Sequence, residues 1–84
     1  MKVEFLLDVL KPHQPSSYFV AQELMKVTGI TKVRIKVEEL DQKTASLQLN
    51  IEGNNLSLEE ITEKLGSLNC AVHSLDEVIC EEKD

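Results

Sequence analysis

The chain has 84 residues, of which 9 are Lys or Arg and 15 are Asp or Glu, so its formal net charge at pH 7 is -6. An acidic chain is a poor candidate for binding nucleic acid or anionic membranes, because both depend on positive charge. No apolar run approaches the roughly 20 residues of a membrane span, and the N-terminus lacks the pattern of a signal peptide. We therefore expect one small cytoplasmic domain over residues 1–80, followed by a charged tail at 81–84.

The first expected strand covers residues 2–10 and alternates in polarity. One parity is entirely apolar, with Val3, Phe5, Leu7 and Val9, and the other parity holds Glu4, Leu6, Asp8 and Leu10. A strand that is apolar on one face and partly apolar on the other is typical of the centre of a sheet. Asp8 is the exception, since a carboxylate there costs free energy unless it is paired, hydrogen-bonded or bound to a metal.

A helix is expected next, over residues 17–28. Two prolines end the first strand, and Ser16 or Ser17 is placed to cap the helix. Apolar residues then recur at helical spacing as far as Val27, and Gly29 is placed to stop the helix.

Two alternating segments, 31–40 and 45–52, predict a hairpin joined by the polar turn 41–43. The first of these strands carries Lys32, Arg34 and Lys36 on its polar face. Such a basic row is typical of a solvated face that protects an edge strand from pairing. RNA binding is not expected, because the expected central strands offer no outward aromatic side chain for base stacking.

The last third predicts a turn at 53–55, a second helix ending near Gly66, and a final strand over 69–80. Ser57 and Glu60 have the spacing of a capping box at the helix start. The parity of the final strand shifts, which indicates a bulge at 74–76. Both cysteines, Cys70 and Cys80, fall in this strand about 33 Å apart if it is extended, so we expect two reduced, buried thiols.

The element order is β-α-β-β-α-β, which is the ferredoxin-like pattern of the α+β class. Right-handed crossovers favour a four-stranded antiparallel sheet in the order 4-1-3-2, with both helices on one face. The other face of the sheet is then open for a site or an interface.

The polar residues of the open face suggest a divalent metal site. With the first and third strands placed in the same direction, Asp8, Glu52, Asn50 and His73 converge, and His13, Asp76 and Glu77 can join them from flanking segments. Carboxylates and an amide suit Ca, Mg or Mn, and histidine adds Zn. The alternative is that Asp8 and His73 only pair with each other, which is an ordinary way to satisfy two polar groups.

Apolar side chains are also expected on or near this face, namely Leu6, Leu10, Leu40 and Leu75. A contiguous apolar patch on a small domain marks an interface more often than chance exposure. A domain of this size buries only roughly 60% of its unfolded surface, so assembly with copies of itself is a plausible source of stability.

Catalysis has no positive indication in the sequence. No Gly-rich phosphate loop and no Ser-His-Asp or Cys-His arrangement is present. We therefore expect a non-enzymatic, homo-oligomeric binding module. Two alternatives remain open at this point, namely a regulatory domain that senses a small effector bound between subunits and, less favoured, a metal-dependent hydrolase.

Four segments together resemble an uncharacterised archaeal family known as "domain of unknown function 211". These segments are residues 8–13 (DVLKPH), 33–41, 51–56 (IEGNNL) and 72–78 (VHSLDEV). The resemblance covers about residues 3–78 and implies a ferredoxin-like fold and a ring-like homo-oligomer that binds divalent metal. Family motif positions fall on Asp8, Lys11, His13, His73, Asp76 and Glu77. The chain departs from the pattern with Asn69-Cys70, where relatives often have a Gly pair.

Overall fold

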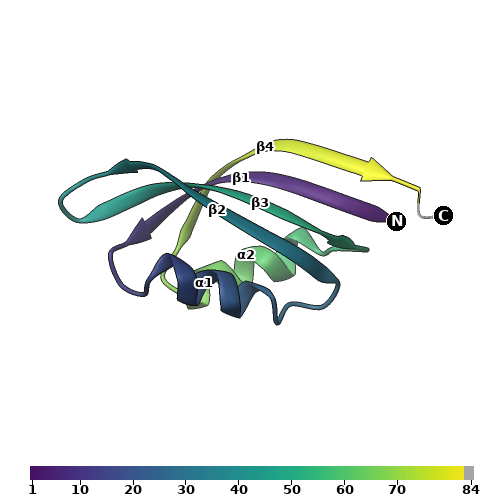
Figure 1. Cartoon of the computed structure of the whole chain (residues 1–84), viewed down its shortest axis with the longest axis horizontal. Helices are drawn as coiled ribbons and strands as arrows, with labels where there is room; N and C mark the ends of the chain where they lie inside the picture. The colour runs from purple at the N-terminus through teal and green to yellow at the C-terminus, as the bar shows by residue number, and fades with distance from the viewer. Residues whose placement is uncertain (83–84) are drawn as a thin grey trace.

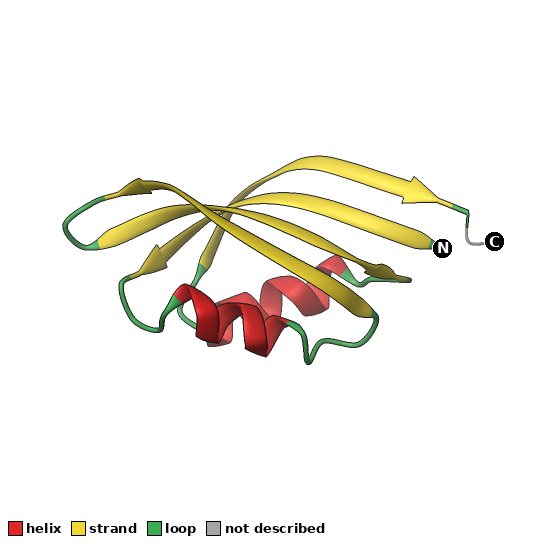
Figure 2. Cartoon of the chain, in the orientation of Figure 1, coloured by secondary structure: helices red, strands yellow, loops and turns green. Residues whose placement is uncertain are grey.

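The computed structural model describes residues 1–82 and contains six elements in the predicted order. They are β1 (Lys2–Pro12), α1 (Ser17–Leu24), β2 (Ile30–Leu40), β3 (Thr44–Asn54), α2 (Leu58–Ser67) and β4 (Ala71–Glu81). The strands form one sheet in the order β2-β3-β1-β4, and both helices lie against the same face of it (Figure 1). The predicted ferredoxin-like α+β fold is therefore confirmed, with two layers and one open sheet face (Figure 2).

The directions of the strands differ from our expectation in one respect. β1 is antiparallel to both of its neighbours, β3 and β4, and β3 is antiparallel to β2. The prediction that the first and third strands run in the same direction is wrong. The crossover through α1 brings β2 back parallel to β1, and the hairpin then reverses the chain into β3, so β3 must oppose β1.

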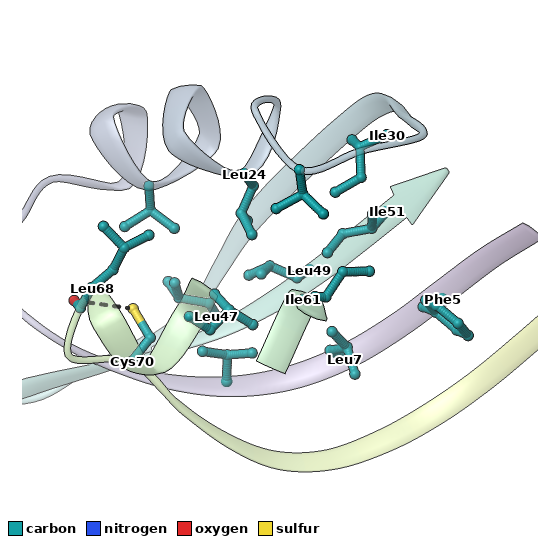
Figure 3. Close-up of a cluster of buried hydrophobic side chains, with 14 of the residues drawn as sticks. Phe5, Leu7, Leu24, Ile30, Leu47, Leu49, Ile51, Ile61, Leu68 and Cys70 are labelled. Atoms are coloured by element: carbon teal, nitrogen blue, oxygen red, sulfur yellow. Dashed lines mark hydrogen bonds between the residues drawn. The ribbon is translucent and has the colours of Figure 1, made fainter. Parts of the chain in front are cut away.

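The core lies between the sheet and the helices (Figure 3). The core contains the alternate apolar residues of β1 that were predicted to face inward and the corresponding alternate residues of β3. The helices add Val20, Leu24, Ile61 and Leu65. Ser16 and Ser57 cap the two helices through their hydroxyl groups, as their positions in the sequence predicted.

An ion pair joins the helices. Glu23 of α1 lies 3.2 Å from Lys64 of α2, and it also lies 2.6 Å from Lys26. These two ammonium groups, Lys26 first, lower the pKa of the Glu23 carboxyl.

The strands are much longer than the helices that cover them. Each strand has 11 residues and the helices have 8 and 10, which corresponds to about 36 Å against about 12 and 15 Å. Both ends of the sheet consequently extend past the helices (Figure 1). Apolar side chains of the helix-covered face are left exposed at the end of β2, with Val37 at 49% and Leu40 at 69%, and along the edge strand β4, with Leu75 at 39% and Val78 at 50%.

The predicted apolar patch on the open face is only half present. Leu6 and Leu10 lie on that face, with Leu10 exposed. Leu40 is paired with the buried Ala45, and Leu75 with the buried Leu7, so both belong to the opposite face. Bulges in the edge strands shift their parity, and this is why alternation counted along the sequence misplaced them.

Element ends also differ from the prediction. α1 ends at Leu24 instead of Thr28, and hydrogen-bonded turns lead from there to Gly29. Residues 53 and 54 were predicted to be part of a turn, but they extend β3. Of the predicted tail, Glu81 ends β4, and residues 83–84 lie outside the described residues. Asn69 has φ +64°, a left-handed conformation that Asn adopts more readily than most residues.

The expected bulge in β4 is present, and a second one accompanies it. Leu6 pairs with Glu77 and Leu7 with Leu75, which leaves Asp76 as an extra residue. In the same way, Asp8 pairs with Ser74 and Val9 with Val72, which leaves His73 unpaired opposite β1.

The two cysteines are free, as expected, but only Cys70 is buried. Burial raises the pKa of its thiol, so the group stays protonated and inert. Cys80 is exposed, contrary to expectation, because the end of β4 lies beyond the helices. No helix among residues 1–82 is long and apolar enough to cross a membrane.

Two glycines allow the end of β3 to approach the loop before β2. Gly29 has φ +91°, and its carbonyl accepts a hydrogen bond of 2.9 Å from the amide of Asn54. A side chain on Gly53 has no room, because its Cβ would overlap the Gly29 carbonyl. This contact closes the end of the core beneath β2 and β3.

We predict that Gly53→Ala lowers the free energy of unfolding by about 2 to 3 kcal/mol, because the backbone must shift to admit the methyl group. Gly66→Ala is the matched control. Its Cβ would meet no atom within 4 Å, and alanine in a helix gains about 0.5 to 1 kcal/mol over glycine. Urea denaturation followed by circular dichroism measures both changes, and equal midpoints for the two variants would contradict the close-approach argument.

Candidate functional site

A pocket of about 260 Å³ opens on the uncovered face of the sheet, near the end of β1. Its lining residues are Asp8, Val9, Leu10, Ser46 and His73. They come from three adjacent strands, because the last residues of β1 lie between the first residues of β3 and of β4. Of the residues predicted to form the site, Asp8 and His73 are thus brought together.

The sheet positions these two side chains in different ways. Asp8 is on the open-face parity of the central strand, between Gln48 of β3 and Ser74 of β4. His73 is the extra residue of a bulge in the edge strand β4. Bulges commonly redirect a side chain beside a site, and here the imidazole reaches the pocket that Asp8 lines.

Asp8 and His73 do not satisfy each other. Within residues 1–82, the side-chain hydrogen bonds and ion pairs include neither the Asp8 carboxylate nor the His73 ring. Asp8 is half-buried, so its carboxylate has lost part of its hydration without gaining a protein partner. Both groups are therefore free to bind something in the pocket.

Glu52 does not join this site. It is paired with Glu4, four residues before Asp8 on β1, which is about 13 Å along the strand. Its carboxylate lies instead 3.7 Å from the ammonium group of Lys32. Asn50 is likewise displaced, opposite Leu6. The predicted convergence was wrong for both residues because β3 is antiparallel to β1.

His13 has a different partner. Its Nε2 donates to the carbonyl oxygens of Asp41 and Gln42, at 2.9 and 3.0 Å, so this nitrogen carries the proton and is not a free metal ligand. His13 ties the loop after β1 to the turn between β2 and β3.

The acidic residues of β4 lie away from the pocket lining. Glu77 is opposite Leu6, and Asp76 is the bulge residue beside it. Among the described residues, no group of three or more His, Cys, Asp or Glu side chains is close enough to hold a metal ion. The predicted site is therefore reduced to Asp8 and His73, to which the structure adds Ser46.

The main feature that the sequence analysis missed is the burial of Lys11, which it noted only as a family motif position. Only 4% of Lys11 is exposed, and its ammonium group donates to the carbonyls of Pro12, His13 and Pro15, at 2.8, 3.4 and 2.7 Å. The three protons of the ammonium thus meet three acceptors. The available signal was its parity, since Lys11 continues the apolar series of β1 and a lysine there must find partners. These hydrogen bonds hold the loop that follows β1, the strand that lines the pocket.

The fold and the pocket together define a small α+β protein with a ferredoxin-like sheet and a polar site on its open face. Comparison with known families gives the assignment: the chain belongs to domain of unknown function 211, described as Uncharacterized ArCR, whose model matches residues 3–83. It is also 42% identical over 78 residues to Uncharacterized protein MJ0319 of Methanocaldococcus jannaschii, an alignment that covers 93% of this chain and 80% of the relative. The family resemblance that the motifs indicated is confirmed.

We predict that Lys11→Met lowers the free energy of unfolding by about 2 kcal/mol, because three carbonyls lose a charged hydrogen-bond donor while the apolar stem is kept. Lys43→Met, at an exposed position of the hairpin turn, should change stability by less than about 0.5 kcal/mol. Urea denaturation of both variants provides the measurement. A Lys11→Met protein as stable as the parent would show that burying the lone ammonium costs as much as its hydrogen bonds return.

Proposed function

We propose that this protein is a cytoplasmic, non-enzymatic binding module that works as an assembly of identical copies and holds a divalent cation in the pocket of Asp8, Ser46 and His73. The observation that carries the proposal is the Asp8 carboxylate. It is half-buried on the central strand, faces a pocket shared with an imidazole, and has no hydrogen-bond or ion-pair partner within residues 1–82. A divalent cation compensates such a group directly.

The number of protein donors favours a partly hydrated cation. One carboxylate, one hydroxyl and one imidazole are too few for a closed metal cage, but Mg²⁺ and similar ions keep several waters and often use only one or two carboxylates. The pocket volume of about 260 Å³ corresponds to roughly eight or nine waters at about 30 Å³ each. It can accommodate the ion together with its remaining waters or with a small anionic ligand that replaces them.

Assembly is supported by the apolar surface that one copy leaves uncovered. Val37, Leu40, Leu75 and Val78 are all at least 39% exposed on the helix-covered face. These side chains lie on the two edge strands, β2 and β4, where a second copy can bury them. A domain of 84 residues gains proportionally more from such burial than a large one, because its own core is small.

We predict that the protein binds Mg²⁺, Mn²⁺, Ca²⁺ or Zn²⁺ with an affinity that Asp8→Asn lowers by at least about tenfold, since even the loss of a group that only orients a metal ligand costs 10- to 100-fold. Isothermal titration with each chloride salt measures the affinity. Native mass spectrometry of protein purified without chelator gives the metal content and the mass of the assembly.

Glu4→Gln is the matched control for Asp8→Asn. It removes a carboxylate from the same face of the same strand, but at the end of β1 that lies opposite Glu52, so cation binding should be unchanged. If none of the four cations binds the parent protein, or if Glu4→Gln weakens binding as much as Asp8→Asn, the pocket is not a cation site.

A further inference from the structure

The open face of the sheet changes in charge from one edge to the other. On β2 it carries Lys32, Arg34 and Lys36, all of which are exposed. On β4 it carries Glu77 and Glu81, and that strand contains no Lys or Arg. An anion that lies on this face is therefore attracted toward β2 and repelled from β4.

One row of side chains crosses this face from the pocket to the basic edge. Asp8 of β1 is opposite Gln48 of β3, and Gln48 is opposite Lys36 of β2. Neighbouring strands are about 4.8 Å apart, so the Cα atoms of Asp8 and Lys36 are separated by roughly 10 Å. Asp8 and Gln48 are half-buried, and Lys36 is exposed. The row thus connects the proposed cation position to an ammonium group over a distance that a small molecule can span.

The next pair along the same two strands has the same character. Asn50 of β3 is half-buried and is opposite Arg34 of β2. Among residues 1–82, the side-chain hydrogen bonds and ion pairs include none of Gln48, Asn50, Arg34 and Lys36. Two amides and two basic groups beside the pocket are consequently available to a ligand.

This arrangement is complementary to a molecule with an anionic group at each end. A divalent cation held by the single carboxylate of Asp8 keeps a net positive charge at the pocket. Lys36 and Arg34 supply positive charge at the edge, and only uncharged amides lie between. Glu39, which is opposite Ser46 on the other side of the row, repels an anion and so directs it toward the two basic residues.

We propose that the pocket cation and the basic edge of β2 together bind a small dicarboxylate. One carboxylate of the ligand replaces waters on the cation, and the other binds the ammonium of Lys36 and the guanidinium of Arg34. Arginine suits this role because it can donate two parallel hydrogen bonds to one carboxylate. The inference rests on the proposed function, since the cation is one of the two anchors.

The spacing of the strands selects the length of the ligand. The anchors are two strand spacings apart, and the flexible four-carbon stem of Lys36 can cover about one of them. The body of the ligand spans the other, about 4.8 Å across Gln48. This is comparable with the separation of the end carboxyl groups in four- and five-carbon dicarboxylates. A three-carbon dicarboxylate is too short to reach both anchors.

The overall charge of the chain makes dicarboxylate binding depend on the cation. The formal net charge is -6, and two carboxylates, those of Asp8 and Glu39, lie on or beside the path of the ligand. A dianion is therefore repelled until the cation is in place. Because coupling between two ligands is reciprocal, the dicarboxylate raises the affinity for the cation by the same factor.

Isothermal titration tests the proposal. The protein is saturated with whichever of Mg²⁺, Mn²⁺, Ca²⁺ and Zn²⁺ binds most tightly, and malonate, succinate, glutarate and adipate are then titrated. Acetate is the control with one carboxylate, and inorganic phosphate is the compact dianion. Succinate or glutarate should bind at least about tenfold more tightly than acetate, because a hydrogen bond to a charged group contributes at least that factor. Without the cation, neither should bind.

Charge reversal identifies the second anchor. Lys36→Glu should lower the affinity for succinate and glutarate by at least about tenfold without lowering the affinity for the cation. Lys43→Glu is the matched control, because it makes the same charge change at an exposed position of the hairpin turn, and it should leave both affinities unchanged. Asp8→Asn should lower both. Unchanged circular dichroism shows that each variant keeps the fold.

The outcomes separate the two proposals. A parent protein that binds none of the four cations overturns both. A parent protein that binds a cation but no dicarboxylate, or that binds acetate or phosphate as tightly as succinate and glutarate, overturns the dicarboxylate site and leaves the cation site standing. Equal loss of dicarboxylate affinity in Lys36→Glu and Lys43→Glu has the same meaning.

Discussion

The structure depends on β1, which is hydrogen-bonded along almost its whole length to β3 on one side and β4 on the other. Because a strand turns alternate residues to opposite faces, this pairing commits one parity of β1 to the core and the other to the open face. Asp8 is thereby held where water reaches it only partly, between two neighbouring strands. The bulge that leaves His73 unpaired opposite β1 then supplies the second polar group of the pocket.

A second constraint is the difference in length between strands and helices. Two short helices cannot cover four strands of 11 residues each, so apolar side chains at the end of β2 and along the edge strand β4 remain exposed. In an isolated domain these overhangs are an aggregation risk.

Much of the fold was predictable because local patterns and tertiary structure agree. The alternation of β1, β2 and β3, the serine caps of both helices and the bulge in β4 each have a local physical cause that the sequence displays. The direction of β3 follows from the crossover and the hairpin and not from a local pattern, and the incorrect direction assigned to it moved Glu52 and Asn50 into a site that they do not share. Leu40 and Leu75 were misplaced for a related reason, because a bulge changes the face of every residue after it.

The sequence by itself determined which segments form strands and helices and the order of these elements, because hydrophobic periodicity and capping act over a few residues. Only the tertiary structure decided which polar groups meet. It placed Asp8 and His73 in one pocket on two adjacent strands, bound His13 to the hairpin turn, and buried the ammonium of Lys11 among backbone carbonyls. Such contacts depend on the register and direction of strands that are distant in the chain, and no short stretch of sequence encodes either one.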